Sequence, residues 1–202
     1  MNSVEDAVLV LEAGQPVVIP TDTVYGLACD PENENAVRLL SELKGRSPEQ
    51  PIALVAVSVE ALLKLVPEVR GVGEKVARAL LPGPYTLVLP NPARRLPQLA
   101  GSRPETIGVR VPDLDGPGRV VLERVGAVAA TSANLHGGPD PRRLEDVPSE
   151  LRQGVAALVD GGELPGTPST VIDLTGAEPR VVREGAVPVE EALTRVAAIL
   201  GE

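Results

Sequence analysis

Hydrophobic residues recur along the chain with two spacings, one typical of helices and one typical of strands. Ser3 and Asp6 are spaced as in a capping box, and the apolar residues of 4–11 recur at helical spacing until Gly14 ends the segment. We therefore expect the chain to begin with a helix. The same spacing predicts further helices at 32–43, 58–66, 69–81, 118–124 and 189–200.

Short, wholly apolar runs predict strands that are covered on both sides, and residues 52–57 (IALVAV) are the clearest example. Because helices and strands interleave, the pattern favours an α/β fold with helices packed on a sheet. The last strands have no helices between them, so we expect a mixed sheet. No repeat or long linker divides the chain, so residues 1–202 are expected to form a single domain. The other predicted strands are 17–20, 86–89, 107–111, 127–130, 155–159, 170–174 and 180–183.

Scarce residue types exclude several classes of function. The 202 residues include one cysteine and one histidine, which excludes an internal disulfide and a zinc site made of three histidines. Phe and Trp are absent and Tyr25 and Tyr85 are the only aromatic residues, so a stacking platform for single-stranded nucleic acid is not expected. The net charge of −9 means that any RNA contact would have to be local and weak.

The beginning of the chain is acidic and amphipathic and lacks a basic region, so we do not expect a signal peptide. No apolar run approaches the ~18 residues that a membrane-spanning helix needs. These features predict a soluble, cytoplasmic protein without membrane contacts.

Polar residues gather in segments that flank the predicted strands. In residues 20–27 (PTDTVYGL), the hydroxyls of Thr21, Thr23 and Tyr25 would form a polar wall for a small ligand. The alternative is an Asx or ST turn with Tyr25 in the core.

Lys44, Gly45 and Arg46 follow the second predicted helix. Gly45 would end that helix and let both cations turn toward one anion. The alternative is that the two cations only complement the helix dipole.

Thr106, Gly108 and Arg110 share one face of a predicted strand, because side chains alternate with a period of two. An arginine in such an apolar strand lies either at a solvated edge or in a polar pocket.

Residues 131–138 (TSANLHGG) and 168–170 (PST) also flank predicted strands, and Arg183 ends the last predicted strand. Small hydroxyls and glycines allow backbone N–H groups to approach a phosphate, although a plain glycine-rich turn is equally compatible. His136 is either a general base or a solvent-facing residue, and Cys29 is either a nucleophile or a small buried residue. Together, the polar segments favour binding of a phosphorylated ligand over nucleophilic catalysis.

Seven motifs occur in the order found in the YrdC/Sua5/TsaC family, and between about residues 5 and 190 the chain resembles that family. The motifs are PTDTVYGL, KGR, PGPYTLVL, GVRVP, TSANLHGG, STVIDL and VREG. The resemblance implies a twisted α/β sheet around a concave cavity, in the short form of the family without an extra C-terminal domain.

The resemblance also implies a reaction. A threonylcarbamoyl-AMP synthase joins L-threonine, bicarbonate or CO2 and ATP into L-threonylcarbamoyladenylate and releases pyrophosphate, with Mg2+ on the phosphates. A partner threonylcarbamoyltransferase complex then modifies an adenosine of tRNA beside the anticodon.

The family motifs assign roles to residues of this chain. The KxR and SxN signature implies a catalytic set of Lys44, Arg46, Ser132 and Asn134. The implied ATP-binding residues are Lys44, Arg46, Gln50, Thr106, Ser132, Asn134 and Arg183. The implied threonine-binding residues are Thr23, Tyr25, Arg110 and Ser169.

Three positions depart from the family pattern. Gln50 and Val55 stand where the family commonly has Asn and His, and His136 stands where it often has Ser. The longer Gln50 would keep an amide contact, whereas Val55 would not replace a histidine.

Two other interpretations remain. One is a carbamoyltransferase-type relative from hydrogenase maturation, which normally adds acylphosphatase and zinc-finger regions. The other is a non-catalytic RNA-binding or ribosome-maturation module, against which the net charge and the scarcity of aromatics argue.

Overall fold

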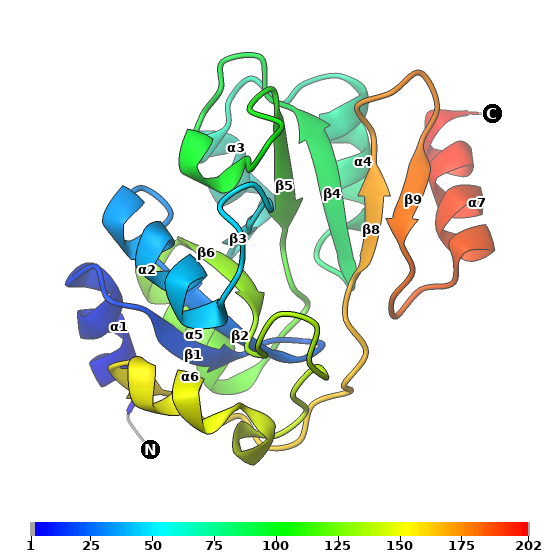
Figure 1. The fold of residues 1–202 in the computed structure, drawn as a ribbon. Coiled ribbons are helices and arrows are strands. Elements are labelled where there is room, and N and C mark those ends of the chain that lie inside the picture. The colour runs from blue at the N-terminus through cyan, green and yellow to red at the C-terminus, as the bar shows by residue number, and fades with distance from the viewer. Residues whose placement is uncertain (1–2, 202) are drawn as a thin grey trace.

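A computed structural model describes residues 3–201 of the chain. The first helix begins as its capping box predicts: the Asp6 N–H donates to Ser3 Oγ at 3.1 Å, and the Ser3 N–H donates to Asp6 Oδ2 at 2.9 Å. The helices are α1 (Val4–Glu12), α2 (Glu34–Lys44), α3 (Val59–Leu65), α4 (Val72–Leu80), α5 (Gly116–Val125), α6 (Ser149–Gly154) and α7 (Val189–Leu200), with 3-10 turns at Pro97–Leu99 and Leu144–Asp146 (Figure 1).

The strands of residues 3–201 join into one nine-stranded sheet in the order β7-β1-β2-β6-β3-β5-β4-β8-β9. Three neighbouring pairs, β1–β7, β3–β5 and β4–β8, are parallel and the others are antiparallel, which confirms the predicted mixed sheet. The strands are β1 (Val17–Pro20), β2 (Tyr25–Cys29), β3 (Ala53–Ala56), β4 (Tyr85–Pro90), β5 (Thr106–Arg110), β6 (Ala127–Ser132), β7 (Ala157–Leu158), β8 (Thr170–Asp173) and β9 (Arg180–Arg183).

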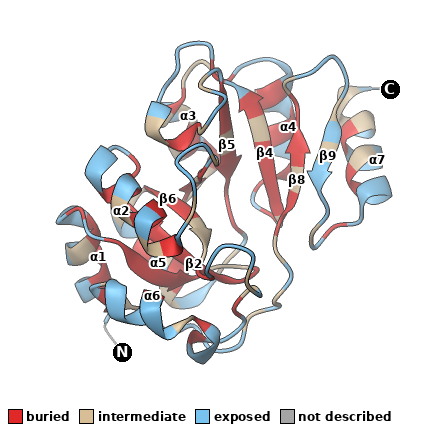
Figure 2. Ribbon diagram, in the orientation of Figure 1, coloured by how far each residue is buried: buried red, intermediate tan, exposed pale blue. Residues whose placement is uncertain are grey.

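One face of the sheet is covered by helices along its whole length. Alternate strand residues, Leu27, Leu54, Val109, Leu87 and Ile172, pack there in one continuous core with α2, α3, α4, α6 and α7. The twist of the sheet separates α2 and α6 from α4 and α7 (Figure 1). The strands are buried from β1 to β8, whereas β9 is mostly exposed at the edge (Figure 2).

The opposite face is covered over only part of its length. There α1 and α5 pack on β7, β1, β2 and β6, with Ala7, Leu11 and Val121 among the residues of a second, smaller core. No helix of residues 3–201 packs on this face of β5, β4, β8 and β9. The missing layer leaves a cavity on this part of the sheet.

Two elements were not predicted. Residues 25–27 were expected to belong to a connecting segment, but Tyr25–Cys29 form β2, buried between β1 and β6. The strand forms because pairing on both edges outweighs the turn-forming sequence before it. The short helix α6 (Ser149–Gly154) was also missed, and Leu151 is its only fully buried side chain.

Within residues 3–201, every helix is too short or too polar to cross a membrane.

Candidate active site

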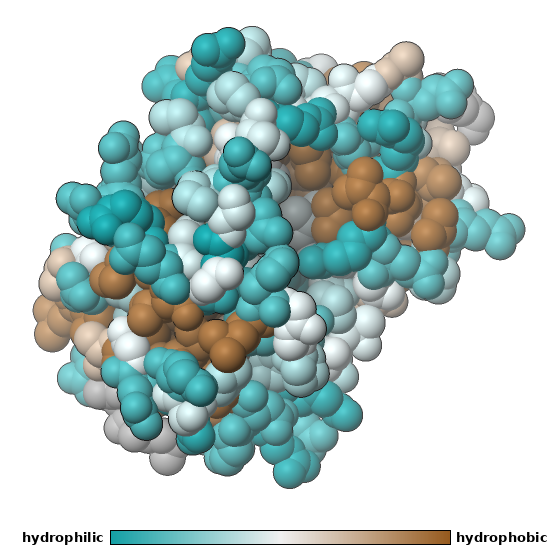
Figure 3. All heavy atoms as spheres, viewed as in Figure 1, coloured by the Kyte–Doolittle hydropathy of each residue, from teal (hydrophilic) through white to brown (hydrophobic). Residues whose placement is uncertain are grey.

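The cavity on the open part of the sheet has a volume of about 430 Å³. Its floor is made of small or apolar residues from adjacent strands: Ala53 and Val55 of β3, Gly108 of β5, Val88 of β4 and Val171 of β8. These residues alternate with those that face the larger core, as the pleat of a sheet requires. The apolar floor continues to the β9 edge of the sheet, where hydrophobic side chains gather over β8 and β9 (Figure 3).

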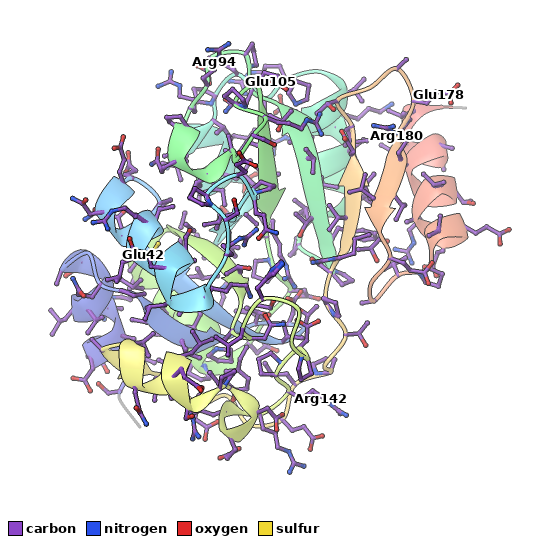
Figure 4. The ribbon with its side chains drawn as sticks, viewed as in Figure 1. Glu42, Arg94, Glu105, Arg142, Glu178 and Arg180 are labelled. Carbon is purple, nitrogen blue, oxygen red and sulfur yellow. The ribbon has the colours of Figure 1, made fainter. Side chains whose placement is uncertain are left out.

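Cationic side chains surround this floor. Among the described residues, four arginines line the cavity, Arg46, Arg103, Arg110 and Arg183, against one carboxylate, Asp173. The cavity is therefore positive in a protein whose net charge is −9. By contrast, the charged side chains labelled in Figure 4 are exposed on the periphery: Glu42, Arg94, Glu105, Arg142, Glu178 and Arg180.

Arg110 points into the cavity from β5 and is 9% exposed, so the structure selects the polar pocket over a solvated edge. Its NH2 donates to Asp22 Oδ1 and to Thr23 Oγ1, the latter at 2.7 Å. Its buried Nε has no hydrogen-bond partner within residues 3–201. Burial lowers the pKa of the guanidinium, and the neighbouring Asp22 opposes that shift. Because the charged guanidinium lines the cavity, it is well suited to an anionic ligand.

Arg46 occupies the other side of the cavity. Gly45 ends α2 with a positive φ of 65°, so the chain turns back after Lys44. The guanidinium of Arg46 donates to Thr131 Oγ1 at 3.1 Å, Gln50 Oε1 at 3.2 Å and the carbonyl of Pro51 at 2.8 Å. These contacts fix it beside the end of β6.

Lys44 lies behind this wall and does not line the cavity. Its Nζ lies near four oxygens: the carbonyls of Ser132 at 2.5 Å and Asn134 at 3.0 Å, Asn134 Oδ1 at 2.5 Å and Ser132 Oγ at 3.3 Å. Burial and the nearby charge of Arg46 lower the pKa of Lys44 to about 8. The lysine therefore holds residues 132–134 in place.

Arg183 and Ser169 form a third group at the edge of the cavity. Arg183 NH2 donates to the Ser169 carbonyl at 2.8 Å and lies 3.2 Å from Ser169 Oγ. The Ser169 hydroxyl shares a hydrogen bond of 2.8 Å with Thr86 Oγ1. Desolvation lowers the pKa of Arg183.

Comparison with known proteins shows the family to which this chain belongs. The sequence model of the Sua5/YciO/YrdC family, described as telomere recombination, matches residues 9–185. The chain belongs to the Sua5/YciO/YrdC family. This finding confirms the resemblance carried by the seven motifs.

Two relatives of this Sua5/YciO/YrdC protein show how far the similarity extends. A Pyrococcus abyssi protein named threonylcarbamoyl-AMP synthase is 35% identical over 193 residues, which cover 95% of this chain and 55% of the relative. A Mycobacterium tuberculosis H37Rv protein named putative threonylcarbamoyl-AMP synthase is 37% identical over 201 residues, covering 99% of this chain and 90% of the relative. The chain thus spans little more than half of the first relative.

Solved structures of the family confirm the fold. The structure of P. abyssi Sua5 complexed with L-threonine matches with a TM-score of 0.86 and 34% identity, over 98% of this chain and 57% of that one. Escherichia coli YciO matches with a TM-score of 0.82 and 29% identity, over 93% of this chain and 91% of that one.

The structure brings most of the predicted site residues of this family member together. Thr106 shares one face of β5 with Gly108 and Arg110, as predicted. Residues that line the cavity are Arg46, Thr106, Arg110, Ser132, Ser169 and Arg183. Residues that contact these from outside the lining are Lys44, Gln50, Thr23 and Asn134.

Tyr25 lies elsewhere. It is fully buried in the larger core, and its hydroxyl is 2.9 Å from Asp160 Oδ1 and accepts from the Gly161 N–H at 2.9 Å. Burial raises its pKa to about 12. A contact between Tyr25 and threonine therefore stays a prediction from sequence. The burial of Tyr25 in the larger core does not favour that contact.

Arg103 is the most important lining residue that the sequence did not indicate. Its NH1 donates to Asp173 Oδ2 at 3.1 Å and its NH2 to Thr175 Oγ1 at 2.8 Å, while Thr106 Oγ1 donates to its carbonyl at 2.9 Å. Arg103 lies in an irregular segment before β5. Such a segment has no periodicity of side-chain directions, so the sequence does not predict where the Arg103 side chain points. The only available signal was its position just before a strand that already carried site residues.

Two candidate catalysts are placed outside the site. Cys29 is buried in the core, and desolvation raises its pKa to about 12, so it is a structural residue. His136 is exposed on the loop after β6 and does not line the cavity.

Proposed function

We propose that this protein is a threonylcarbamoyl-AMP synthase, which joins L-threonine, bicarbonate or CO2 and ATP and releases pyrophosphate. The observation that carries the proposal is one cavity in which Arg46, Arg110 and Arg183 face an apolar floor. The threonine carboxylate, the carbamate and the ATP phosphates are all anions held in one cavity, so orientation and cation screening dominate the barrier. The names of relatives that match 95% or more of the chain support the same conclusion.

The threonine end of the site is Arg110. Its guanidinium lines the cavity and would donate to the threonine carboxylate in a charge-assisted hydrogen bond. Thr23 supports the guanidinium from behind, and Ser169 lines the cavity nearby.

The nucleotide end is formed by Arg46, Arg183, Thr106 and Ser132, which all line the cavity. Their guanidinium and hydroxyl groups would bind phosphate and ribose oxygens. Lys44, Asn134 and Gln50 lie behind this wall, and we assign them to holding Ser132 and Arg46 in place.

The proposed reaction has two steps. The threonine amine attacks the carbon of CO2 and loses a proton to solvent, which gives a carbamate. With bicarbonate, the amine proton leaves together with hydroxide as one molecule of water. A carbamate oxygen then attacks the α-phosphorus of ATP, and the bond to the β-phosphate oxygen breaks with release of pyrophosphate. The arginines screen the repulsion between carbamate and phosphates and stabilise the charge on the leaving pyrophosphate.

The nucleotide substrate is expected to be MgATP. Among the described residues, no group of three or more Asp, Glu, His or Cys could hold a metal ion, and Asp173 is engaged by Arg103. The residues present therefore fit an ion that enters on the phosphates of ATP rather than one resident in the protein.

The product is a mixed anhydride that water would hydrolyse, so a consuming partner is required. We propose that a tRNA-modifying threonylcarbamoyltransferase complex takes it, in the cytoplasm where ATP, threonine and tRNA are present. With a net charge of −9, a direct tRNA contact would be weak and confined to the rim of the cavity.

The test is a pyrophosphate-release assay with each substrate omitted in turn. We expect release only when ATP, L-threonine and bicarbonate are all present, together with a product of the mass of threonylcarbamoyl-AMP. Pyrophosphate release that ignores threonine would overturn the assignment.

A carbamoyltransferase-type activity is the second candidate, because full-length HypF shares the fold with a TM-score of 0.72 at 20% identity. That candidate predicts pyrophosphate release from carbamoyl phosphate and ATP without threonine. The same assay therefore separates the two, and binding of RNA without turnover would favour a non-catalytic module.

A further inference from the structure

A buried carboxylate lies directly behind Arg110. Asp22 belongs to the turn between β1 and β2, and its side chain is 8% exposed. One oxygen, Oδ1, accepts from Arg110 NH2, and the other, Oδ2, accepts from the Asp113 N–H at 3.0 Å. Asp22 does not line the cavity. It therefore connects the turn before β2, the last residue of β5 and the segment after β5 without facing a ligand.

An ion pair buried this far is a weak source of stability. Desolvation raises the pKa of Asp22 even with the guanidinium beside it, which shows that its charge is costly to bury. Replacing a buried ion pair by apolar residues of similar volume commonly leaves the free energy of unfolding unchanged or raises it. What apolar residues cannot supply is a fixed orientation for Arg110.

The contacts of Arg110 define that orientation. NH2 has two hydrogens, and its two acceptors are Asp22 Oδ1 and Thr23 Oγ1, neighbours in one turn. Both oxygens accept from the same nitrogen, so the guanidinium cannot rotate without losing one of the two hydrogen bonds. Nε–H is left without a partner within residues 3–201.

The turn that carries these acceptors is itself held by hydrogen bonds. Thr21 Oγ1 accepts from the N–H groups of Thr23 at 3.2 Å and Val24 at 3.3 Å, and it donates to the Val24 carbonyl at 2.7 Å. The result is a short, internally bonded turn. Asp22 is thus fixed from its own turn and from Asp113.

We infer that Asp22 is a positioning residue for threonine recognition: it holds the Arg110 guanidinium in the orientation in which it lines the cavity and meets the substrate carboxylate. Asp22 does not touch substrate and acts only through Arg110. The inference rests on the proposed function, because it takes threonine as the ligand of Arg110.

The test replaces Asp22 by asparagine, which keeps the shape but offers one acceptor oxygen where two are used. The amide must give up either the Arg110 or the Asp113 contact. We expect the KM for threonine to rise by about tenfold, the size expected from losing one charge-assisted hydrogen bond. The KM for ATP, and kcat at saturating threonine, should not change.

The matched control is Asp115→Asn on the same connecting segment. Asp115 is exposed, and its side chain makes no capping hydrogen bond at the start of α5. This variant should behave as the wild type. A Michaelis constant for ATP that rises together with that for threonine in Asp22→Asn would show a general structural role and overturn the inference.

A ligand that lacks the carboxylate sharpens the result. L-Threoninol has the amine and hydroxyls but no carboxylate, so its affinity as a competitor should be the same in the wild type and in Asp22→Asn. An equal loss of affinity for threoninol would contradict positioning through Arg110.

A readout without turnover separates this inference from the proposed function. The Nε–H signal of Arg110 in a 1H–15N NMR spectrum should be sharp in the wild type and in Asp115→Asn and broadened or averaged in Asp22→Asn. An unchanged signal would overturn the inference, whatever the enzyme assay gives. If the wild type neither binds threonine nor releases pyrophosphate, the proposed function fails while this measurement still decides the orientation of Arg110.

Should Asp22→Asn fail to fold, Asp22→Glu takes its place. Glutamate keeps both oxygens and the charge but displaces the guanidinium by the length of a methylene group. The threonine KM should still rise while that for ATP does not, and unchanged kinetics in this folded variant would refute positioning by Asp22.

Discussion

Two parts of one sheet face are built from similar residues and used differently. On β7, β1, β2 and β6 the face is apolar and is covered by α1 and α5. On β3, β5, β4 and β8 the same face is again small and apolar, with Ala53, Val55, Gly108 and Val88, but it forms the floor of a cavity. A missing helix layer, rather than a special set of strands, distinguishes the two parts.

The comparison also shows where the cavity obtains its chemistry. The covered part is closed by apolar helix residues such as Leu11 and Val121. The open part is bordered by arginines at strand ends and in connecting segments, such as Arg46 after α2 and Arg183 at the end of β9. We therefore expect substitutions in the covered part to change stability and those in the open part to change binding.

The largest effect is expected from Leu11→Ala in the covered part. Leu11 is 2% exposed, and a buried leucine replaced by alanine costs ~2–5 kcal/mol of unfolding free energy. Michaelis constants of the folded fraction should not change, since α1 does not reach the cavity. Chemical denaturation and substrate titration check this, with Leu9→Ala, an exposed residue of the same helix, as the control. Altered substrate constants in Leu11→Ala would break the comparison.

Arg46→Ala should show the reverse behaviour. Removing a guanidinium that faces the phosphates costs ~1.5–3 kcal/mol per charge-assisted contact, so kcat/KM should fall by about 100-fold. The control is Arg38→Ala on α2, whose side chain is exposed and, within residues 3–201, forms an ion pair only with Glu42, at 2.7 Å. Turnover in Arg46→Ala equal to that in Arg38→Ala would remove Arg46 from the site.

A smaller effect is expected for Arg103, which is half-exposed at the edge of the cavity. Because solvent screens its charge, Arg103→Ala should raise the KM for ATP by only about three- to tenfold. Arg180→Ala is a close control, since Arg180 also lies near Asp173, at 3.7 Å, but does not line the cavity. Equal effects of the two variants would assign Arg103 to the support of Asp173 alone.

The smallest effect concerns the pH dependence of Lys44. Its pKa is lowered to about 8, below the ordinary value of 10.5 that it has when unfolded. Between these two values the unfolded chain binds more protons, so this residue makes stability rise with pH there. Nucleotide affinity should instead fall above pH 8 by a few-fold, because a neutral amine has two N–H donors for four acceptors.

Lys44→Met should lose both pH dependences, whereas Lys64→Met, at an exposed position, should keep them. Nucleotide titrations and denaturation curves between pH 7 and 10 measure the two quantities. An affinity that does not change with pH in the wild type would show that the lysine charge does not hold the Ser132–Asn134 segment.

The sequence predicted the helices and strands whose own hydrophobic pattern is clear. Helix α2 was recognised from its apolar stripe and ends at Gly45 as expected, and the apolar run at 52–57 contains β3. Strand β2 was missed because Tyr25–Cys29 follows a turn sequence and is a strand only through pairing with β1 and β6. The position of Tyr25 follows from that omission: alternation along β2 points Gly26 to the cavity and Tyr25 to the core.

The site was predictable where a motif carried it and not where distant segments meet. Arg110 was identified from its strand, but its partner Asp22 lies 88 residues away along the chain. Arg103 and Asp173 are 70 residues apart and meet because β4 pairs with both β5 and β8. Such contacts depend on the order of strands in the sheet, and hydrophobic periodicity does not predict that order.

The most direct test of the account is a crystal structure of the protein with L-threonine and a non-hydrolysable ATP analogue. We predict both ligands side by side on the open part of the sheet, with the threonine carboxylate on Arg110 and the phosphates between Arg46 and Arg183. Either ligand bound on another surface, while this cavity holds only solvent, would contradict it.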